Sequence, residues 1–398
     1  MAGAGTKYEE LLRDVLNSAQ AQDYAGYSKY DALNSPVLRS LSLNNKWLRL
    51  LFTQAVKCCP FNIRPLFCVR KSRNPKGIAL FARANLSLYE KTGEQSVLQE
   101  AESLLQWLLD NPSPYQHNLC WGYNFIWQST LFQLDAREPN VVVTVFVGEA
   151  LIHAYRVTRK EKYLDSAQSV SRFIINDVPV LFEDDEQRAI AYVLKKVDAV
   201  VLNNNALAGA FLIKLWKETG NIELRAAAKK LITYTVNRRT DYYAWYYTEP
   251  RGKSPITHDN YHTGGILDAL LEYYEETGEE TFVVIYRNGL EYYRDHLFDR
   301  DGAPRWMNNK RYPRDIHGSA QGIITFAKAG HHYRMYYEQA EKILAWTQTH
   351  LYRPGTCDYA YRQGRFMKWN YSLMRWCNAW MARALGEMLI YNKRSDAD

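Results

Sequence analysis

One feature limits the possible folds of this chain more than any other, a helical-hairpin signature that returns along the sequence. Residues 89–109 read "YEKTGEQSVLQEAESLLQWLL", which is the end of one helix, a tight turn and a second amphipathic helix. Similar stretches follow, and their turn threonines, Thr92, Thr158, Thr219 and Thr277, stand 66, 61 and 58 residues apart. A fifth copy turns at Gly330. Periods of this length predict stacked helical hairpins joined by long linkers.

The first helix of each hairpin is apolar nearly all round, as in "VVVTVFVGEALIHAY" at 141–155. Such helices must be enclosed by other helices, whereas their partners carry charges on one face and look outward. We count six of these inner helices. The sequence therefore predicts an all-α fold, an (α/α)6 toroid of helical hairpins formed by residues 1–398 as a single domain. Residues 1–43 are expected to be an extension that packs on the toroid, and residues 44–56 to be the sixth outer helix.

Composition agrees with a large globular core that meets a flat ligand. Hydrophobic residues make up 47% of the chain and charged residues 23%, as in ordinary globular proteins. A chain of 398 residues exceeds the usual single-core size, but a closed repeat can hold it in one domain. The 30 tyrosines and 11 tryptophans suit a wall that meets both water and a partly apolar ligand such as a glycan.

The formal charge of +7 is spread thinly, and the densest basic run is "VRKSRNPKG" at 69–77. No nucleic-acid-binding motif accompanies it, so we expect no nucleic-acid partner. An anionic sugar polymer or a membrane surface would explain the run equally well. The start, "MAGAGTKYEELL", lacks the layout of a signal peptide, and no apolar stretch approaches the length of a membrane span. We therefore expect a cytoplasmic protein without a transmembrane segment.

Cysteine spacing and nucleotide-binding or metal-binding motifs point to no bound group. The six cysteines show neither CxxC spacing nor a dense framework, which predicts reduced thiols. There is no phosphate-binding glycine loop and no HExxH pair. We expect neither a cofactor nor a metal.

Polar residues precede every predicted inner helix: Asn74, Asn140, Asn203 to Asn205, residues 258–262, residues 314–317 and Asn370. In a toroid with parallel inner helices, these starts meet at one mouth. A single Asn or Asp is explained as a helix cap, but capping does not explain the surplus in "THDNYHTGG" at 257–265 or in "RDIH" at 314–317. Converging helix N-termini also suit oxyanions such as carboxylates. The mouth is therefore the expected functional face.

The catalytic candidates lie in these two surplus segments. Tyr261 and His262 fall in the first turn of one inner helix, and His317 takes the equivalent place on the next, so all three could face one ligand and move protons. The alternative is that each histidine satisfies a buried backbone carbonyl. Asp259 and Asp315 are the alternative pair, the acid and base of a glycosidase.

The binding candidates surround the same mouth. Arg314 suits a carboxylate through its planar fork, or else forms an ion pair with Asp315. The predicted substrate-binding set is completed by residues at helix starts and by aromatic residues that either stack on sugar rings or pack under a loop. It comprises His258, Asn260, Asn204, Trp121, Tyr123 and Trp127.

Several of these stretches resemble a known family. "NPKGIALFA" at 74–82, "WGYNFIWQS" at 121–129, "DNYHTGGILDAL" at 259–270 and "YPRDIHGSAQGIIT" at 312–325 are similar to an uncharacterised prokaryotic family. That family is met among surface-polysaccharide biosynthesis genes and belongs to the six-hairpin glycosidase-like superfamily. Some members carry the label delta-aminolevulinic acid dehydratase, an enzyme with a (β/α)8 barrel, which the helical repeats contradict.

A weaker local likeness concerns the segment "NYHTGGILDAL", which is similar to part of glucuronyl C5-epimerases. The likeness implies a functional Tyr261, and with it His262. This chain lacks the β-rich domains of those epimerases, so the implication ends there.

Three function classes follow. The leading hypothesis is an enzyme of polysaccharide biosynthesis or modification that removes the C5 proton of a uronate-containing glycan, as an epimerase or a lyase. The second is a glycoside hydrolase that uses the Asp pair, and the third is a non-catalytic glycan-binding protein. The expected partner in each case is an oligosaccharide or polysaccharide, anionic in the first.

Overall fold

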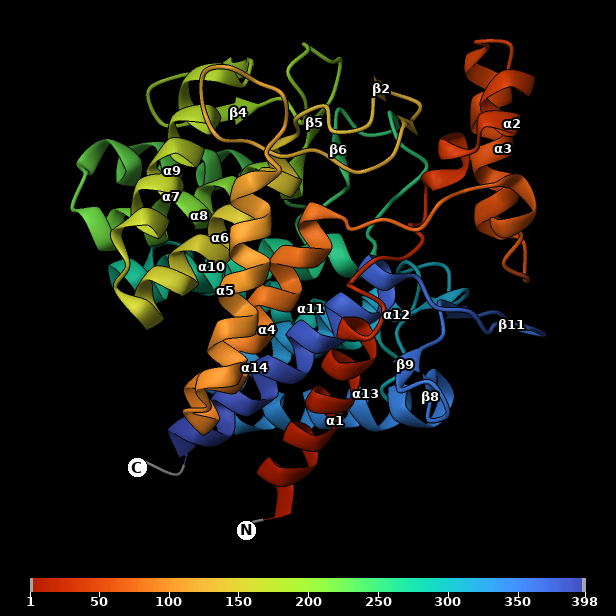
Figure 1. The fold of residues 1–398 in the computed structure, drawn as a ribbon. Helices are drawn as coiled ribbons and strands as arrows, with labels where there is room; N and C mark the ends of the chain where they lie inside the picture. The colour runs from red at the N-terminus through yellow and green to blue at the C-terminus, as the bar shows by residue number, and fades with distance from the viewer. Residues whose placement is uncertain (1–2, 396–398) are drawn as a thin grey trace.

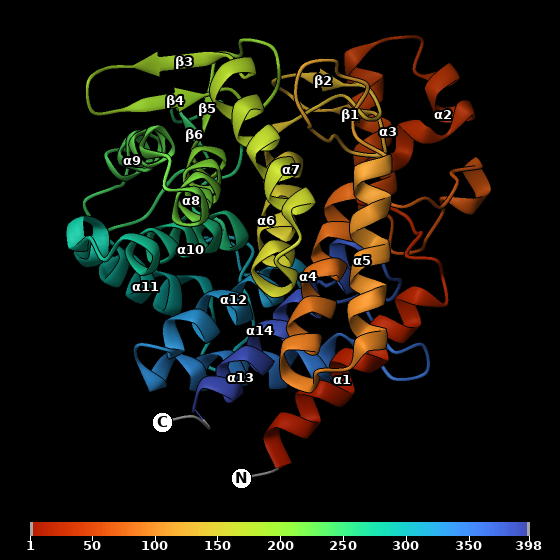
Figure 2. The ribbon, with the colours of Figure 1, turned by 60° about the vertical axis from the view of Figure 1, so that its left-hand side comes forward.

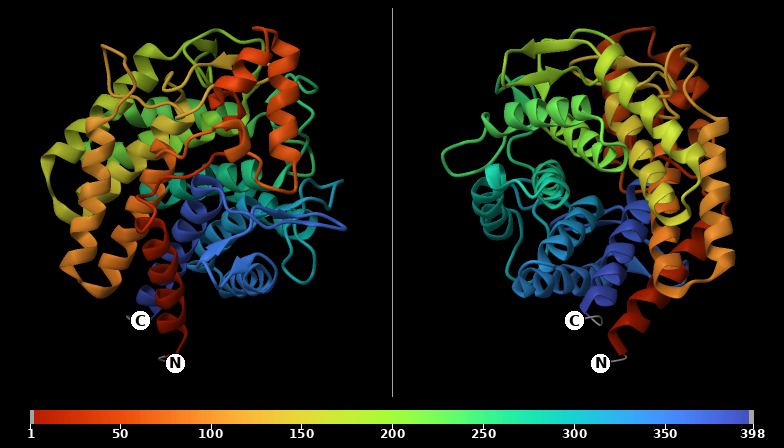
Figure 3. Two further views of the ribbon diagram at one scale, coloured as in Figure 1. Left: turned by 45° about the vertical axis from the view of Figure 1, so that its right-hand side comes forward. Right: turned by 90° about the vertical axis from the view of Figure 1, so that its left-hand side faces the viewer.

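The computed structural model describes residues 3–395, and its helices form a closed ring of hairpins (Figure 1). Each inner helix contacts the next one, and the last returns to the first. Figure 3 (right) shows the hairpins following one another around this ring. The predicted (α/α)6 toroid is confirmed. The inner helices are α4 (Pro75–Thr92), α6 (Val141–Thr158), α8 (Leu202–Thr219), α10 (Asn260–Thr277), α12 (Ile316–Gly330) and α14 (Trp380–Ser395), the last preceded by the π-helix η5 (Met374–Ala379).

The outer helices pack on the inner ones, one for each hairpin. They are α5 (Gln95–Asp110), α7 (Glu161–Arg172), α9 (Ile222–Val236), α11 (Val283–Leu297), α13 (Arg334–His350) and α1 (Gly3–Gln20). The sixth position is filled by α1, which packs on α14. The prediction of a sixth outer helix at 44–56 was wrong, because α3 (Lys46–Cys58) contacts η1 (Asp31–Asn34) and β1 (Trp127–Gln128) instead. The single-domain assignment and its extension at 1–43 stay predictions.

The repeat threonine closes one helix and leads into the next. The Thr92 hydroxyl donates to the Leu88 carbonyl at 2.9 Å and accepts from the Glu94 amide at 3.3 Å. Thr158, Thr219 and Thr277 make the same pair of bonds. Left-handed glycines end three of the four helices, with φ of 73°, 70° and 71° at Gly93, Gly220 and Gly278. The signature therefore encodes the turn of each hairpin.

Short strands and turns occupy the linkers between hairpins. The strands β1 to β6 lie at the end of the ring opposite both chain termini (Figures 1 and 2). Antiparallel pairs form between β1 (Trp127–Gln128) and β2 (Gln133–Leu134), β3 (Val180–Glu183) and β4 (Arg188–Ile190), β5 (Val200–Val201) and β6 (Thr248–Glu249), and β8 (Tyr352–Arg353) and β9 (Asp358–Tyr359). A three-stranded sheet has the order β11 (Lys368–Trp369), β10 (Arg362–Gln363), β7 (Arg314–Asp315). The remaining elements are α2 (Pro36–Leu41), η2 (Pro65–Phe67), η3 (Phe173–Asp177) and η4 (Glu280–Phe282).

Within residues 3–395, α6 is the one helix long and apolar enough to cross a membrane, which corrects the expectation that no apolar stretch approaches that length. It is an inner helix of the ring, however, and 72% of it is buried inside the protein. All six cysteines are free thiols, as predicted.

Candidate functional site

A cleft of about 470 Å³ opens where the inner helices begin. Every inner helix contributes to this cleft through the same position, the second residue after its N-cap. The six residues at this position all line the cleft, and they are Lys76, Val142, Asn203, Tyr261, His317 and Arg375. The structure therefore confirms that the six helix starts meet at one mouth.

Some of the predicted caps form and others do not. Asn74 and Asn140 accept from the backbone amides of Gly77 and Val143, at 3.4 and 3.0 Å. The cap predicted at Asn370 was wrong, because the last inner helix begins only at Met374. Asn203 to Asn205 lie inside the first turn of α8, which begins at Leu202.

Tyr261 and His317 come together in the wall of the cleft. Their rings stack with centroids 4.4 Å apart and an interplanar angle of 7°. The Trp376 indole meets both rings edge-on, at 5.6 Å from Tyr261 and 4.5 Å from His317. Trp380 lies 4.2 Å from His317 on another side. Two residues that the sequence placed at equivalent helix positions thus share one aromatic box.

His317 is held neutral inside this box. Both of its ring nitrogens are buried without a hydrogen-bond partner among the described residues. Burial lowers the pKa of His317 well below its usual value, and the nearby Lys76, Lys29 and Arg375 lower it further. The alternative reading, in which this histidine satisfies a backbone carbonyl, does not hold for His317.

His262 has a partner on one side and the cleft on the other. Its Nδ1 lies 2.7 Å from Oδ2 of Asp259, a carboxylate that is 1% exposed. The His262 ring lines the cleft and lies 4.4 Å from the Tyr247 ring. The two atoms do not meet hydrogen-bond geometry, so the carboxylate acts on the imidazole through its charge and proximity, and Nε2 is left for a ligand.

Tyr261 cannot serve as a base at neutral pH, and its raised pKa also makes it a weak acid that donates only to a strongly basic acceptor. Burial, followed by the charge of Asp259, raises the pKa of its phenol well above the usual value. The hydroxyl therefore stays protonated at neutral pH.

Two basic side chains in the wall lack a carboxylate partner. The Lys76 amine lies over the Phe146 ring at 3.8 Å and 5.1 Å from the Trp380 centroid. Burial lowers its pKa well below the usual value, and the charge of Arg375 adds to this shift. Arg375 is 3% exposed, lies over the Tyr123 ring, and has a buried Nε without a hydrogen-bond partner. Within residues 3–395 no ion pair joins either side chain to an acid.

Asp315 lies behind the cleft and is fully engaged. It accepts from the His317 amide at 3.0 Å, from Trp376 Nε1 at 2.7 Å and from the Lys29 amine at 3.3 Å. The Lys29 amine also lies 3.7 Å from the Trp376 centroid, and burial lowers its pKa to about 7 despite the charge of Asp315.

Among the residues that the structure describes, no Asp or Glu lines the cleft. Asp259 is paired with His262, and Asp315 binds three donors. Neither carboxylate is available to a sugar as the acid or base of a glycosidase, which would need both at the glycosidic bond.

The predicted aromatic residues divide into two groups. Tyr123 and Trp127 line the cleft, with ring centroids 5.7 Å apart, and the Tyr123 hydroxyl lies 3.2 Å from that of Tyr192. Trp121 does not line it. This indole is fully buried and donates to the Leu108 carbonyl at 2.9 Å, so it packs under the loop.

Four other predicted binding residues are buried and bonded to the scaffold, outside the lining of the cleft. The Arg314 Nη2 atom lies 2.7 Å from Oδ2 of Asp299, so this guanidinium pairs neither with Asp315 nor with a ligand in the cleft. His258 bonds the Trp245 carbonyl and the Tyr242 hydroxyl. Asn260 and Asn204 donate to the carbonyls of Leu297 and Ala191. Their positions support a structural role.

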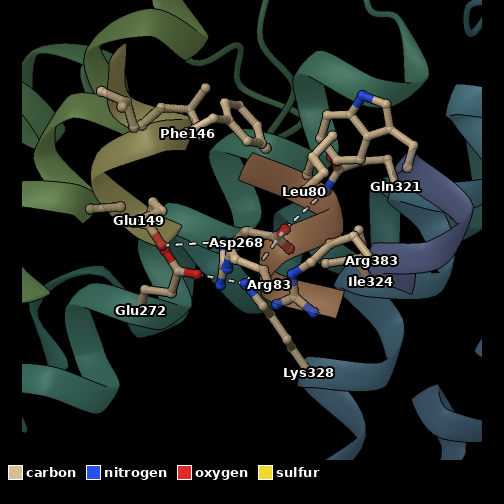
Figure 4. Close-up of a pocket in the computed structure, with 15 residues that line it drawn as sticks. Leu80, Arg83, Phe146, Glu149, Asp268, Glu272, Gln321, Ile324, Lys328 and Arg383 are labelled. Carbon is tan, nitrogen blue, oxygen red and sulfur yellow. Dashed lines mark hydrogen bonds and ion pairs between the residues drawn. The ribbon is translucent and has the colours of Figure 1, made fainter. Parts of the chain in front are cut away.

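The inner helices enclose a second, smaller cavity of about 50 Å³ below the cleft (Figure 4). Here each basic group meets an acid. The Lys328 Nζ atom lies 2.5 Å from Oε1 of Glu272 and 3.8 Å from Oδ2 of Asp268. The Arg83 Nη1 atom lies 3.3 Å from Oε2 of Glu149. Burial raises the pKa of Asp268 to about 6, although Lys328 opposes the shift. We call this cavity the floor.

Sequence reasoning missed Lys76, Arg375 and Lys29. The first two carried a signal, because they occupy the same helix position as Tyr261 and His317. Because the cap of the last inner helix was wrongly placed at Asn370, Arg375 did not fall at this position. Lys29 comes from a linker far from every repeat, so only the folded chain brings it to Asp315.

Comparison with known proteins supports the fold. No protein-family model matches the chain, and no curated protein matches it. A sugar epimerase from a ruminal bacterium has a TM-score of 0.65 at 13% identity, over 81% of this chain and 90% of its own. An unsaturated glucuronyl hydrolase specific for heparin has a TM-score of 0.61 at 16% identity, over 83% and 90%. The Lin0763 protein from Listeria innocua has a TM-score of 0.64 at 14% identity, over 98% of both chains.

TM-scores of 0.61 to 0.65 show that these proteins share the (α/α)6 toroid fold, and identities of 13–16% show no more than the fold. The resemblance to a surface-polysaccharide family and the cytoplasmic location stay predictions.

Proposed function

We propose that this protein is a carbohydrate-active enzyme that removes a proton from C5 of a uronate-containing glycan. The carrying observation is the composition of the cleft: histidine, lysine, arginine and aromatic side chains line it, and no described Asp or Glu does. Basic groups without acids favour an anionic ligand. The aromatic walls suit sugar rings. The similar solved structures include a sugar epimerase and a glucuronyl hydrolase, which agrees with a sugar substrate.

In the proposed mechanism His262 accepts the C5 proton through Nε2, while the charge of Asp259, 2.7 Å from Nδ1, stabilises the imidazolium that forms. The electrons of the C5–H bond move toward the carboxylate carbon. Arg375 and Lys76 stabilise the charge that develops on the carboxylate oxygens, since they lack any other acid. Lys76 becomes an ammonium when the carboxylate arrives, because an adjacent anion raises a lysine pKa.

The second half of the reaction needs a proton donor. Tyr261 fills this role, because its hydroxyl stays protonated in the wall of the cleft. Epimerisation requires delivery to the other face of C5, and because the Tyr261 and His262 rings lie only 4.4 Å apart the sugar has to turn in the cleft between the two proton transfers. Delivery to the oxygen that leaves C4 breaks that bond and forms a C4–C5 double bond. His317 is the further candidate for this step, with its two unpartnered nitrogens.

The test is incubation of the protein with uronate oligosaccharides in deuterated water, followed by NMR and mass spectrometry. Deuterium at C5 of an intact sugar supports epimerisation, and an unsaturated product that absorbs in the ultraviolet supports elimination. Deuterium at C2 would show that the protein removes the C2 proton of the reducing-end sugar and not the C5 proton of the uronate. A new reducing end without deuterium at carbon would indicate hydrolysis, and no change at all would leave glycan binding as the function.

A further inference from the structure

A segment beside the cleft has an unusual charge. Residues 36–73, which include α2, α3 and η2, contain eight Lys and Arg residues and no Asp or Glu. Figure 1 shows α2 and α3 at the edge of the molecule, away from the helical ring. We call residues 36–73 the basic arm.

The basic arm also exposes large apolar side chains. It makes up less than a tenth of the chain but holds seven of the sixteen exposed large hydrophobic residues of the described part. Trp47 is 71% exposed and Phe61 75%. Some of these residues stand four apart along a helix and so form stripes. The seven are Val37, Leu41, Leu43, Trp47, Leu51, Phe61 and Leu66.

A second element with the same character adjoins the arm. The tip hairpin, residues 362–369, exposes Phe366 (88%) and Met367 (51%) between Arg365 and Lys368. It is joined to the end of α3, where Trp369 Nε1 donates to the Cys58 carbonyl at 3.0 Å. The two elements therefore lie together.

Most of the arm's positive charges are not neutralised. Arg64 pairs with Asp31, and Arg73 pairs with Asp23. No ion pair to an acid within residues 3–395 is made by the other six, Arg39, Lys46, Arg49, Lys57, Arg70 and Lys71. Exposed apolar side chains flanked by free cations match the headgroup region of an anionic membrane, where aromatic rings enter the interface and cations meet phosphates.

We propose that the basic arm and the tip hairpin dock on an anionic phospholipid bilayer. A second copy of the chain is a poorer partner, because a two-fold contact would place these acid-free surfaces against each other. Leu50, Gln54 and Lys57 of α3 also line the cleft. Docking therefore brings the mouth to the membrane, and the glycan would be one carried on a lipid. This last step rests on the proposed function, whereas docking itself does not.

The experiment is co-sedimentation of the full chain with vesicles of phosphatidylcholine plus phosphatidylglycerol, compared with pure phosphatidylcholine. We expect binding to the anionic vesicles that weakens with salt. W47S/F366S should lower the partition coefficient by about tenfold or more, because two buried aromatic rings are lost. R70Q/K71Q should lower it by about thirtyfold. The matched control is I222S/V284S, which removes exposed apolar residues of α9 and α11 and should change nothing.

Equal binding to both vesicle types, no binding to either, or an equal loss in I222S/V284S would overturn the proposal. So would a dimer in light scattering that W47S/F366S dissolves, since the patch would then be a self-interface. Activity of W47S/F366S on soluble uronate oligosaccharides should match that of the unmodified protein. Vesicle binding without any uronate activity would reject the proposed function and leave docking standing.

Discussion

The mouth and the floor of the toroid are built by the same six helices, yet they treat charge in opposite ways. In the floor, Lys328 meets Glu272 and Asp268, and Arg83 meets Glu149. In the mouth, Lys76 and Arg375 meet aromatic rings and no acid. A buried charge without a partner costs free energy. Pairing offsets that cost in the floor, whereas the mouth carries it, as expected of a site kept for a ligand.

The largest expected effect concerns the mouth. His262→Gln should lower kcat by about 10²- to 10⁴-fold, because the base that takes the proton is gone. Deuterium incorporation into the sugar measures it. His332→Gln is the matched control, since His332 forms a similar pair with Glu275 on the surface, 3.1 Å apart. Similar activity in the two variants would remove His262 from the mechanism.

The next effect belongs to the floor. Lys328→Met leaves Asp268 without its buried cation and leaves Glu272 with Lys214 alone, and should lower the free energy of unfolding by up to about 3–5 kcal/mol. Urea denaturation followed by circular dichroism measures the loss. Activity per folded molecule should hardly change. A full loss of activity in a still folded variant would mean that the floor takes part in the reaction.

The floor also gives a pH dependence. The pKa of Asp268 rises from 3.8 to about 6 on folding, so the folded protein binds this proton more tightly than the unfolded chain. Stability from this group is therefore present below about pH 4 and is lost as the pH rises to 6, by about 3 kcal/mol. Asp268→Asn should remove this slope in denaturation curves taken between pH 4 and 7. An unchanged slope would assign it to another group.

The smallest effect separates the two regions most sharply. Lys76→Met removes a buried amine that has no acid partner, so stability should stay unchanged or increase, unlike in Lys328→Met. The affinity for uronate should fall by about ten- to a hundredfold, because a charge-assisted hydrogen bond is lost. Calorimetric titration and urea denaturation measure the two quantities. Equal destabilisation by both lysine variants would abolish the distinction between mouth and floor.

The sequence predicts the ring better than the mouth, for a physical reason. Hairpin turns are local, so the bonds of Thr92 and its three equivalents repeat with the chain and mark four of the six inner helices. The direction of a side chain depends on neighbours far away in sequence. Arg314 belongs to the same RDIH segment as His317, but it pairs with Asp299 and does not line the cleft. Lys29 reaches the site from a linker, which no repeat pattern could reveal.

The measurement that tests the central claim most directly is calorimetric titration with a uronate oligosaccharide and its neutral counterpart, in two buffers of different ionisation enthalpy. The lowered pKa of Lys76 predicts that the anionic sugar binds more tightly and takes up a proton from the buffer. Lys76→Met should lose that uptake and Lys328→Met should keep it. Equal affinity for both sugars with no proton uptake would contradict the account.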